Sequence, residues 1–158
     1  MFQEKDQKLF THMGIKGVCH LRLLGPDGKL KEDRLIHNTI TELMDAHVAD
    51  QMSDQGDAAI GYMNVGTGSG QGAADVGLDS ELDRNALDST TQGAAGDDND
   101  VIYVCTWAAG DGTGAITEAG IMQADNNTTM MAYADFAVVN KAAADTLVIT
   151  WTVTFGAS

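Results

Sequence analysis

The sequence predicts a mainly β protein, an antiparallel, jelly-roll-like β-sandwich with one α-helix in its N-terminal half and an extended N-terminal arm. Three observations support this prediction. The last segment alternates apolar residues with threonine, short apolar runs recur between glycine-rich turns, and only one segment has a helical period. At 158 residues the chain has room for one ordinary domain. We therefore expect an arm at 1–16 and a single domain at 17–158.

The segment from Asp145 to Phe155 is the organising strand of this prediction. Its apolar side chains fall on one face with a period of two, while threonines occupy most of the other face. Threonine is β-branched and tolerates water, so this pattern is typical of a sheet that packs on a core on one side only. The residues expected in the core are Trp107, Phe136, Leu147, Ile149, Trp151, Val153 and Phe155.

The beginning of the chain predicts a hairpin after the arm. Residues 1–16 are polar and have no period, which indicates an extended segment. Strands are then expected at 18–24 and 29–36, joined by a turn at Gly25–Gly28 in which proline presets φ and glycine can take a positive φ. His20 is interpreted as an outward strand residue, because no second metal ligand stands at a suitable spacing.

One helix is predicted at about 39–53. Thr39 and Glu42 have the spacing of a capping box, in which each side chain satisfies a backbone N–H of the first turn. His37 and His47 do not form the His-Glu-x-x-His pattern of a zinc protease. The apolar residues that recur with helical spacing, and that we expect to be buried, are Ile40, Leu43, Met44, Val48 and Met52.

The remaining strands are separated by turns and loops. A short helical turn is predicted within 78–87 and a long loop at 88–100, where Asp97–Asp100 is interpreted as a solvated acidic turn because the spacing of a calcium-binding EF-hand is absent. Cys19 and Cys105 lie in apolar runs and are expected to be small buried thiols, with a disulfide left open. Strands are expected at 60–65, 101–107, 116–122, 130–138 and 145–155, the second of them central because it is apolar on both faces.

The glycine-rich loop 66–72 is the most suggestive motif for chemistry. Gly68-x-Gly70-x-x-Ala73 after a strand resembles a loose dinucleotide fingerprint. The apolar helix that should follow is missing, and Asp75 and Asp79 would repel a phosphate. A surface loop is therefore the favoured interpretation. No catalytic constellation is recognised, and no cofactor or metal site is predicted.

The charge of the chain is strongly acidic and unevenly distributed. A net charge of −14 argues against nucleic-acid binding, and no stretch has the length and hydropathy of a membrane span or a signal peptide, so we expect synthesis in the cytoplasm. Residues 1–34 hold seven of the nine Lys and Arg residues but only five of the 23 acidic ones. The beginning of the chain is therefore expected to dock on an acidic partner. The candidate contact residues are Lys5, Lys8, Lys16, Arg22, Lys29, Lys31 and Arg34.

Several short motifs follow one another along the chain. They begin with the turn Gly25–Gly28 and the pair His37-Asn38. Further along they are Met63–Gly68, Leu78 with Glu81–Arg84, Ile116–Met122, Met131-Ala132 with Phe136, and Asp145–Leu147 through Trp151 and Phe155. In this order the motifs resemble a family of small tailed-bacteriophage virion proteins. The resemblance covers roughly residues 17–155, and its motifs are structural.

The resemblance implies an all-β virion protein without enzymatic activity. The expectation that follows is a capsid decoration, or cement, protein that binds the major capsid protein on the capsid surface and stabilises the assembled head. A homo-oligomer, with a trimer favoured, suits binding around symmetry axes. A tail-fibre, baseplate or head-fibre component is the alternative. A nucleotide-binding enzyme that uses loop 66–72 is a remote one.

Overall fold

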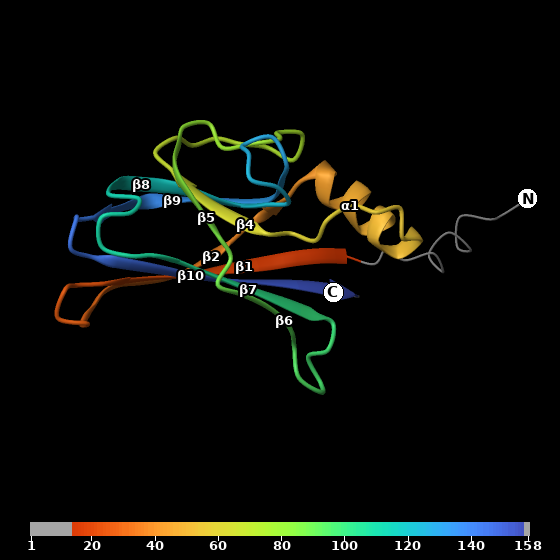
Figure 1. Cartoon of the computed structure of the whole chain (residues 1–158), viewed down its shortest axis with the longest axis horizontal. Helices are drawn as coiled ribbons and strands as arrows, with labels where there is room; N and C mark the ends of the chain where they lie inside the picture. Colours follow the sequence, from red (N-terminus) through yellow and green to blue (C-terminus); the bar gives the residue numbers. More distant parts are fainter. Residues whose placement is uncertain (1–13, 157–158) are drawn as a thin grey trace, which may run out of the picture.

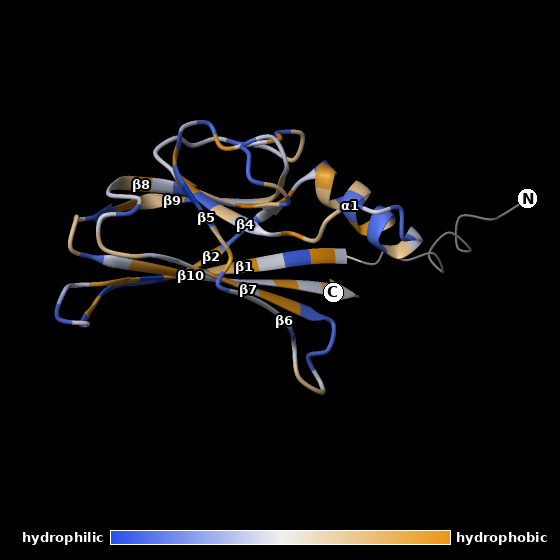
Figure 2. Cartoon of the chain, viewed as in Figure 1, coloured by the Kyte–Doolittle hydropathy of each residue, from blue (hydrophilic) through white to orange (hydrophobic). Residues whose placement is uncertain are grey.

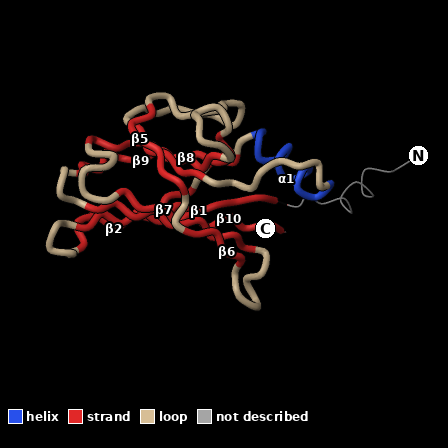
Figure 3. The backbone as a smooth tube through the Cα atoms, in the orientation of Figure 1, coloured by secondary structure: helices blue, strands red, loops and turns tan. Residues whose placement is uncertain are grey.

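Two antiparallel five-stranded sheets form the protein in a computed structural model that describes residues 14–156. Sheet A has the strand order β2-β1-β10-β7-β6 and sheet B the order β3-β9-β8-β4-β5. The sheets form two layers, and the helix lies at one end of them (Figure 1, Figure 3). The predicted mainly β sandwich with one helix is confirmed. The elements are β1 Gly14–Leu24, β2 Leu30–His37, β3 Thr39–Ile40, α1 Glu42–Ser53, β4 Tyr62–Gly66, β5 Glu81–Ala86, β6 Ser89–Gln92, β7 Asp100–Trp107, β8 Gly114–Met122, β9 Met130–Lys141 and β10 Thr146–Gly156.

Strand β10 lies at the centre of sheet A, where it pairs with β1 on one side and β7 on the other. Its inward residues Leu147, Ile149, Trp151 and Val153 are fully buried, as is Trp107 of β7. The alternating face predicted from the sequence is therefore the face that meets sheet B. Figure 2 shows the same alternation of apolar and polar residues along the strands.

Two of the expected core aromatics are only partly buried. Phe155 lies at the end of β10 and Phe136 in the middle of β9, and both pack against the core cluster without being enclosed by it. A residue at the end of a strand has neighbours on fewer sides, so the period-two pattern overstates the burial of Phe155.

The first hairpin is confirmed, with a tight turn in which the Gly25 N–H donates to the Lys29 carbonyl at 2.9 Å. Gly28 has φ +77°, a conformation that favours glycine. Strand β1 begins at Gly14, which is paired with Gly156. Residues 14–16, predicted as the end of the arm, therefore belong to the sheet, and residues 1–13 lie outside the described residues.

Helix α1 begins three residues later than predicted. Thr39 and Ile40 form the short strand β3 against Tyr133 and Ala132 of β9, so the predicted capping box is wrong. The N-cap is Thr41, whose hydroxyl donates to the Met130 carbonyl at 2.6 Å and makes no cap hydrogen bond. Pairing with β9 outcompetes local capping at this point.

The buried face of α1 also differs from the prediction. Met44 is buried as expected, and His47 is buried beside it. Met52, in the last turn of the helix, is 78% exposed. The helical period in the sequence identifies the apolar face of the helix, but it does not show at which residue the rest of the protein stops covering that face.

Two edge strands replace predicted irregular structure. The expected helical turn at 78–87 is wrong, because Glu81–Ala86 pairs with β4 as strand β5. Ser89–Gln92, inside the predicted loop 88–100, pairs with β7 as strand β6. Both sequences are polar and short, so their strand structure comes from the neighbouring strand rather than from their own pattern.

The remaining expectations agree with the structure. Strands β7, β8 and β9 lie where apolar runs predicted them, and β7, expected to be central, lies inside sheet A between β10 and the edge strand β6. Cys19 and Cys105 are both buried free thiols. Burial raises the pKa of both thiols, that of Cys105 to about 12.

Candidate interaction surface

The outer face of sheet B is covered by the chain's own loops. The loop that joins β4 to β5, residues 67–80, folds back over this face and brings a leucine onto it. The apolar cluster below the loop is separate from the main core and consists of Leu78, Met122, Met130 and Tyr133. Sheet B is therefore buried on both sides around this cluster, while Asp135, Ala137, Val138 and Asn140 in the second half of β9 stay exposed.

Glu118 of β8 holds this loop in place. The side chain is fully buried, and its carboxylate accepts hydrogen bonds from the N–H groups of Gly68 and Ser80, both at 2.9 Å, and of Asp79 at 3.3 Å. Thr117 adds a hydroxyl bond to the Gly68 carbonyl at 2.7 Å. A Cβ added at position 68 would lie 2.8 Å from the Glu118 carboxylate, so the close approach requires glycine.

This arrangement bears on the glycine-rich loop 66–72. The N–H of Gly68 donates to a carboxylate of the protein itself, so it is not presented to a ligand phosphate. The negative charge of Glu118 would also repel a phosphate at this point. The geometry therefore favours a structural loop.

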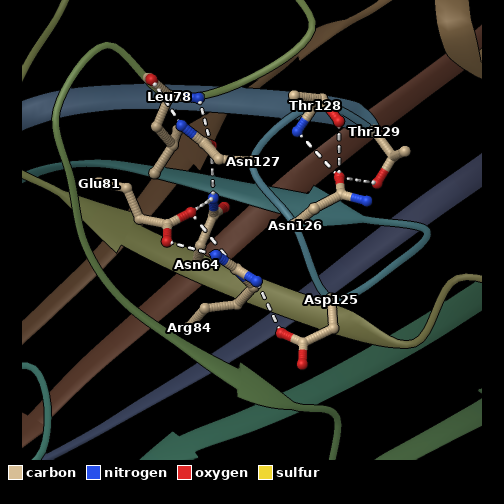
Figure 4. A network of polar contacts seen from close by, with 9 residues as sticks. All are labelled: Asn64, Leu78, Glu81, Arg84, Asp125, Asn126, Asn127, Thr128 and Thr129. Atoms are coloured by element: carbon tan, nitrogen blue, oxygen red, sulfur yellow. Dashed lines mark hydrogen bonds and ion pairs between the residues drawn. The ribbon is translucent and has the colours of Figure 1, made fainter.

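A network of polar side chains also fixes the loop at Leu78 (Figure 4). Asn127 accepts from the Leu78 N–H at 2.8 Å and donates to the Leu78 carbonyl at 2.9 Å. Asn64 donates to both Asn127 and Glu81. These paired contacts act in the way a short strand ladder would, and they order a segment that has no regular structure.

Arg84 extends the network towards solvent. It forms ion pairs with Glu81 at 2.7 Å and with Asp125 at 2.6 Å. Partial burial raises the pKa of Glu81, but the hydrogen bonds from Arg84 and Asn64 more than offset it, and the net pKa is lowered. Glu81 therefore stays ionised and keeps its acceptor role at neutral pH.

The outer face of sheet A, in contrast, is not covered by any helix or strand of the described residues (Figure 1). Alternation places threonines of β10 on this face together with half-buried Val18, Ile102 and Val104 of the flanking strands. On the edge strand β2, Leu35 is 71% exposed. Leu30 of the same strand is 52% exposed, so the edge of this open sheet face presents two accessible leucines.

Three of the predicted contact residues lie on or beside this face. Lys16 and Arg22 point outward from β1, with His20 between them, and Lys29 lies in the hairpin turn. Lys16 and Arg22 form no ion pair with another described residue, and the Lys29 side chain is 86% exposed. His20 pairs with Asp33 at 2.6 Å across the β1–β2 ladder. We call the outward residues of β1 and β2 together with the turn the hairpin surface.

Two further candidates are used within the fold. Lys31 donates to the buried carboxylate of Asp145 at 2.6 Å, which closes the hairpin against the start of β10. Arg34 pairs with Glu32 and donates to the carbonyls of Ala137 and Val138 in β9, so it joins sheet A to sheet B. Lys5 and Lys8 lie outside the described residues.

Sequence reasoning missed the most exposed apolar residue of the hairpin surface, Leu35. Leu35 and Ile36 are adjacent apolar residues, and the sequence alone does not show which of the two points outward. The pairing of Ile36 with buried Cys19 determines that Leu35 must point outward. Once the hairpin is assigned, its register would have been enough to find Leu35.

Comparisons with protein-family models, with curated proteins and with solved structures found no match to this chain. Within residues 14–156, no three His, Cys, Asp or Glu side chains gather as a metal site would require. Among the same residues, no helix has the length and apolar character needed to cross a membrane.

Proposed function

We propose that the protein is a structural virion protein that decorates an assembled phage capsid through the hairpin surface and the adjoining outer face of sheet A. The observation that carries the proposal is the difference between the two sheets. Loop 67–80 covers the outer face of sheet B around Leu78, whereas no helix or strand of the described residues covers the outer face of sheet A, which carries cationic and apolar residues at its edge. The ordered motifs that resemble phage virion proteins support the same function.

The charge division supports an acidic partner such as a capsid surface. The body of the chain is acidic, while Lys16, Arg22 and Lys29 gather on one hairpin. Cationic side chains on an otherwise acidic protein orient its approach to a negatively charged surface, and this attraction weakens as salt rises. The partner we propose is the major capsid protein.

The segments that carry the resemblance to virion proteins make contacts within the fold, which supports a non-enzymatic role. Met63–Gly68, Glu81–Arg84 and Ile116–Met122 meet in the hydrogen bonds of Glu118 and Asn64 that order loop 67–80. Their polar residues are engaged with one another rather than presented to a ligand. A protein whose polar groups are bonded to one another in this way is suited to serve as a rigid structural subunit.

A closed homo-oligomer, with a trimer favoured, fits this role. A decoration protein must occupy many equivalent positions, and cyclic assembly around a capsid symmetry axis supplies several contacts at once. The edge strands β2 and β6 leave unpaired backbone groups at both sides of sheet A, where neighbouring subunits can add contacts.

The proposal is tested by binding of purified protein to capsids of the parent phage that lack it, measured by co-sedimentation. Arg22→Ser and Leu35→Ser should each reduce occupancy at least several-fold, since both residues lie on the hairpin surface. Matched controls are Ser69→Glu, which changes the net charge by the same amount, and Val76→Ser, which removes another exposed apolar residue; both lie in the loop over sheet B.

A deletion that tests the contribution of the arm must leave strand β1 intact. Removal of residues 1–13 leaves the whole strand intact, whereas removal of 1–16 would take away the residues that pair with Thr154 and Gly156. We expect the shorter deletion to fold and to bind capsids more weakly. Equal loss in all four point variants, or co-purification of the intact protein with tails alone, would overturn the capsid proposal.

A further inference from the structure

An apolar pocket opens at the end of the sandwich, between α1 and the strands of sheet A. Its volume is about 520 Å³, in the range of sites that enclose a small molecule or a few side chains. Among the residues that line it are Met44, Val48, Met52, Val101, Tyr103 and Phe155. No part of the described chain fills this space.

The pocket exposes apolar surface that the rest of the fold leaves without a partner. Met52 at its mouth is 78% exposed, and Phe155 is only partly buried. His47 in its wall is 93% buried, and its Nδ1 makes no hydrogen bond; the nearest acidic group is the Asp57 carboxylate at 3.6 Å. Because most of the side chains that line the pocket are apolar, an occupant should also be mainly apolar.

We propose that the protein's own N-terminal segment, residues 1–13, docks in this pocket through Leu9 and Phe10. Strand β1 begins at Gly14, directly opposite Gly156 and next to Phe155 of the pocket wall. Phe10 precedes Gly14 by four residues, a stretch that spans up to about 14 Å when extended. The segment therefore starts one strand away from the pocket and has the reach to enter it.

The segment has one apolar pair at the right distance. Leu9-Phe10 is preceded by the polar run Gln3–Lys8, and Phe2 would need a much longer loop to return to the pocket. A shorter loop costs less closure entropy, and a segment tethered this closely has an effective concentration in the millimolar range. Docking within one chain is thus favoured over capture of the segment from a second copy.

Charge on helix α1, which forms one wall of the pocket, is complementary to the segment. Residues 35–83 contain no Lys or Arg. Helix α1 and the loop after it carry acidic groups, while Lys5 and Lys8 immediately precede the apolar pair. The acidic residues of the helix and of the loop after it are Glu42, Asp45, Asp50, Asp54 and Asp57. This inference concerns the free protein and does not rest on the proposed capsid binding.

The test uses the full chain labelled with ¹³C at the methionine methyl groups. Met44 and Met52 report on the pocket, and buried Met63 of β4, which does not line it, is the internal reference. In the wild-type protein we expect nuclear Overhauser contacts from the Phe10 ring to the Met44 or Met52 methyl group. Phe10→Ala should shift both signals and leave Met63 unchanged, whereas the control Phe2→Ala should shift none of the three.

A second measurement reads out the exposed apolar surface. Phe10→Ala should raise the fluorescence of the apolar dye ANS several-fold, with an unchanged far-ultraviolet circular dichroism spectrum, because the pocket is opened without loss of the fold. Unchanged Met44 and Met52 signals in Phe10→Ala would overturn the proposal. Contacts that appear only between labelled and unlabelled chains in a mixed sample would show that a second copy is the occupant, and would also overturn it.

Discussion

Replacement of Glu118 tests whether one buried carboxylate orders the whole loop over sheet B. In Glu118→Ala the N–H groups of Gly68 and Ser80 lose acceptors at 2.9 Å, and that of Asp79 loses a weaker one at 3.3 Å. A hydrogen bond to a charged group contributes about 1.5–3 kcal/mol. We count the two shorter bonds at the lower end of that range, because Ser80 is exposed and water can replace part of its bond. The free energy of unfolding should therefore fall by about 3 kcal/mol.

The conservative variant Glu118→Gln separates geometry from charge. Its amide oxygen can still accept from Gly68 and Ser80, while its amide nitrogen would face the N–H of Asp79, where two donors meet. We expect a loss of about 1 kcal/mol for this variant. The matched control Asp98→Ala removes an exposed carboxylate whose side chain bonds no described residue, and it should change stability by less than about 0.5 kcal/mol.

Urea denaturation and amide hydrogen exchange measure these effects together. A loss of about 3 kcal/mol corresponds to a fall of about 6–12 °C in the melting temperature for a domain of this size. In Glu118→Ala, exchange should accelerate at residues 68, 79 and 80 well before it does in β10, because local opening of the loop precedes global unfolding. Unchanged protection at these three amides would refute the assigned role of Glu118.

Three further predictions concern the core, the hairpin and the loop. Trp151→Ala should cost about 3–5 kcal/mol in urea denaturation, because the side chain is fully buried; an unchanged midpoint would contradict its place in the core. Lys31 holds the pKa of Asp145 below its ordinary value of 3.8, so the stability that this carboxylate contributes is present above about pH 4 and is lost as the pH falls through the folded-state pKa. Lys31→Met should flatten that acid limb of the stability profile, and an unaltered limb would show that the pair is unimportant. Calorimetric titration with dinucleotides and nucleoside triphosphates should give no heat of binding at loop 66–72, whereas a micromolar site would revive the enzyme alternative.

The central strands were predictable because each carries its own pattern. In β10 the alternation of Leu147, Ile149, Trp151 and Val153 with outward residues is long enough to specify both the strand and its buried face. The first hairpin was predictable because its turn residues are chemically distinctive. In these segments, local preference and tertiary packing favour the same structure.

The edge strands and the start of the helix were not predictable in the same way. Ser89–Gln92 is polar throughout, and only its pairing with β7 makes it a strand. Thr39 has the spacing of a helix cap, yet it lies in β3 because β9 offers a partner. In both places a distant segment decides the conformation, and a single sequence does not show which segments meet.

The role of Glu118 was hidden for a related reason. A glutamate on a strand is normally read as exposed, and the sequence contains no sign that a loop from Gly68 to Ser80 will enclose it. The glycine-rich loop drew attention as a possible phosphate cradle, while the group that engages its amide lies 50 residues further along the chain. The hydrogen bond from Gly68 to the buried Glu118 thus shows that this loop makes a structural contact where the sequence suggested a binding site.

The most direct test of the proposed function is electron cryo-microscopy of the parent phage particle with and without this protein. We predict difference density at symmetry-related positions on the capsid, into which the sandwich fits with the hairpin surface and the outer face of sheet A towards the shell. The loop over sheet B should point away from it. Density confined to the tail, or a fit in which sheet B contacts the capsid and sheet A faces solvent, would contradict the account.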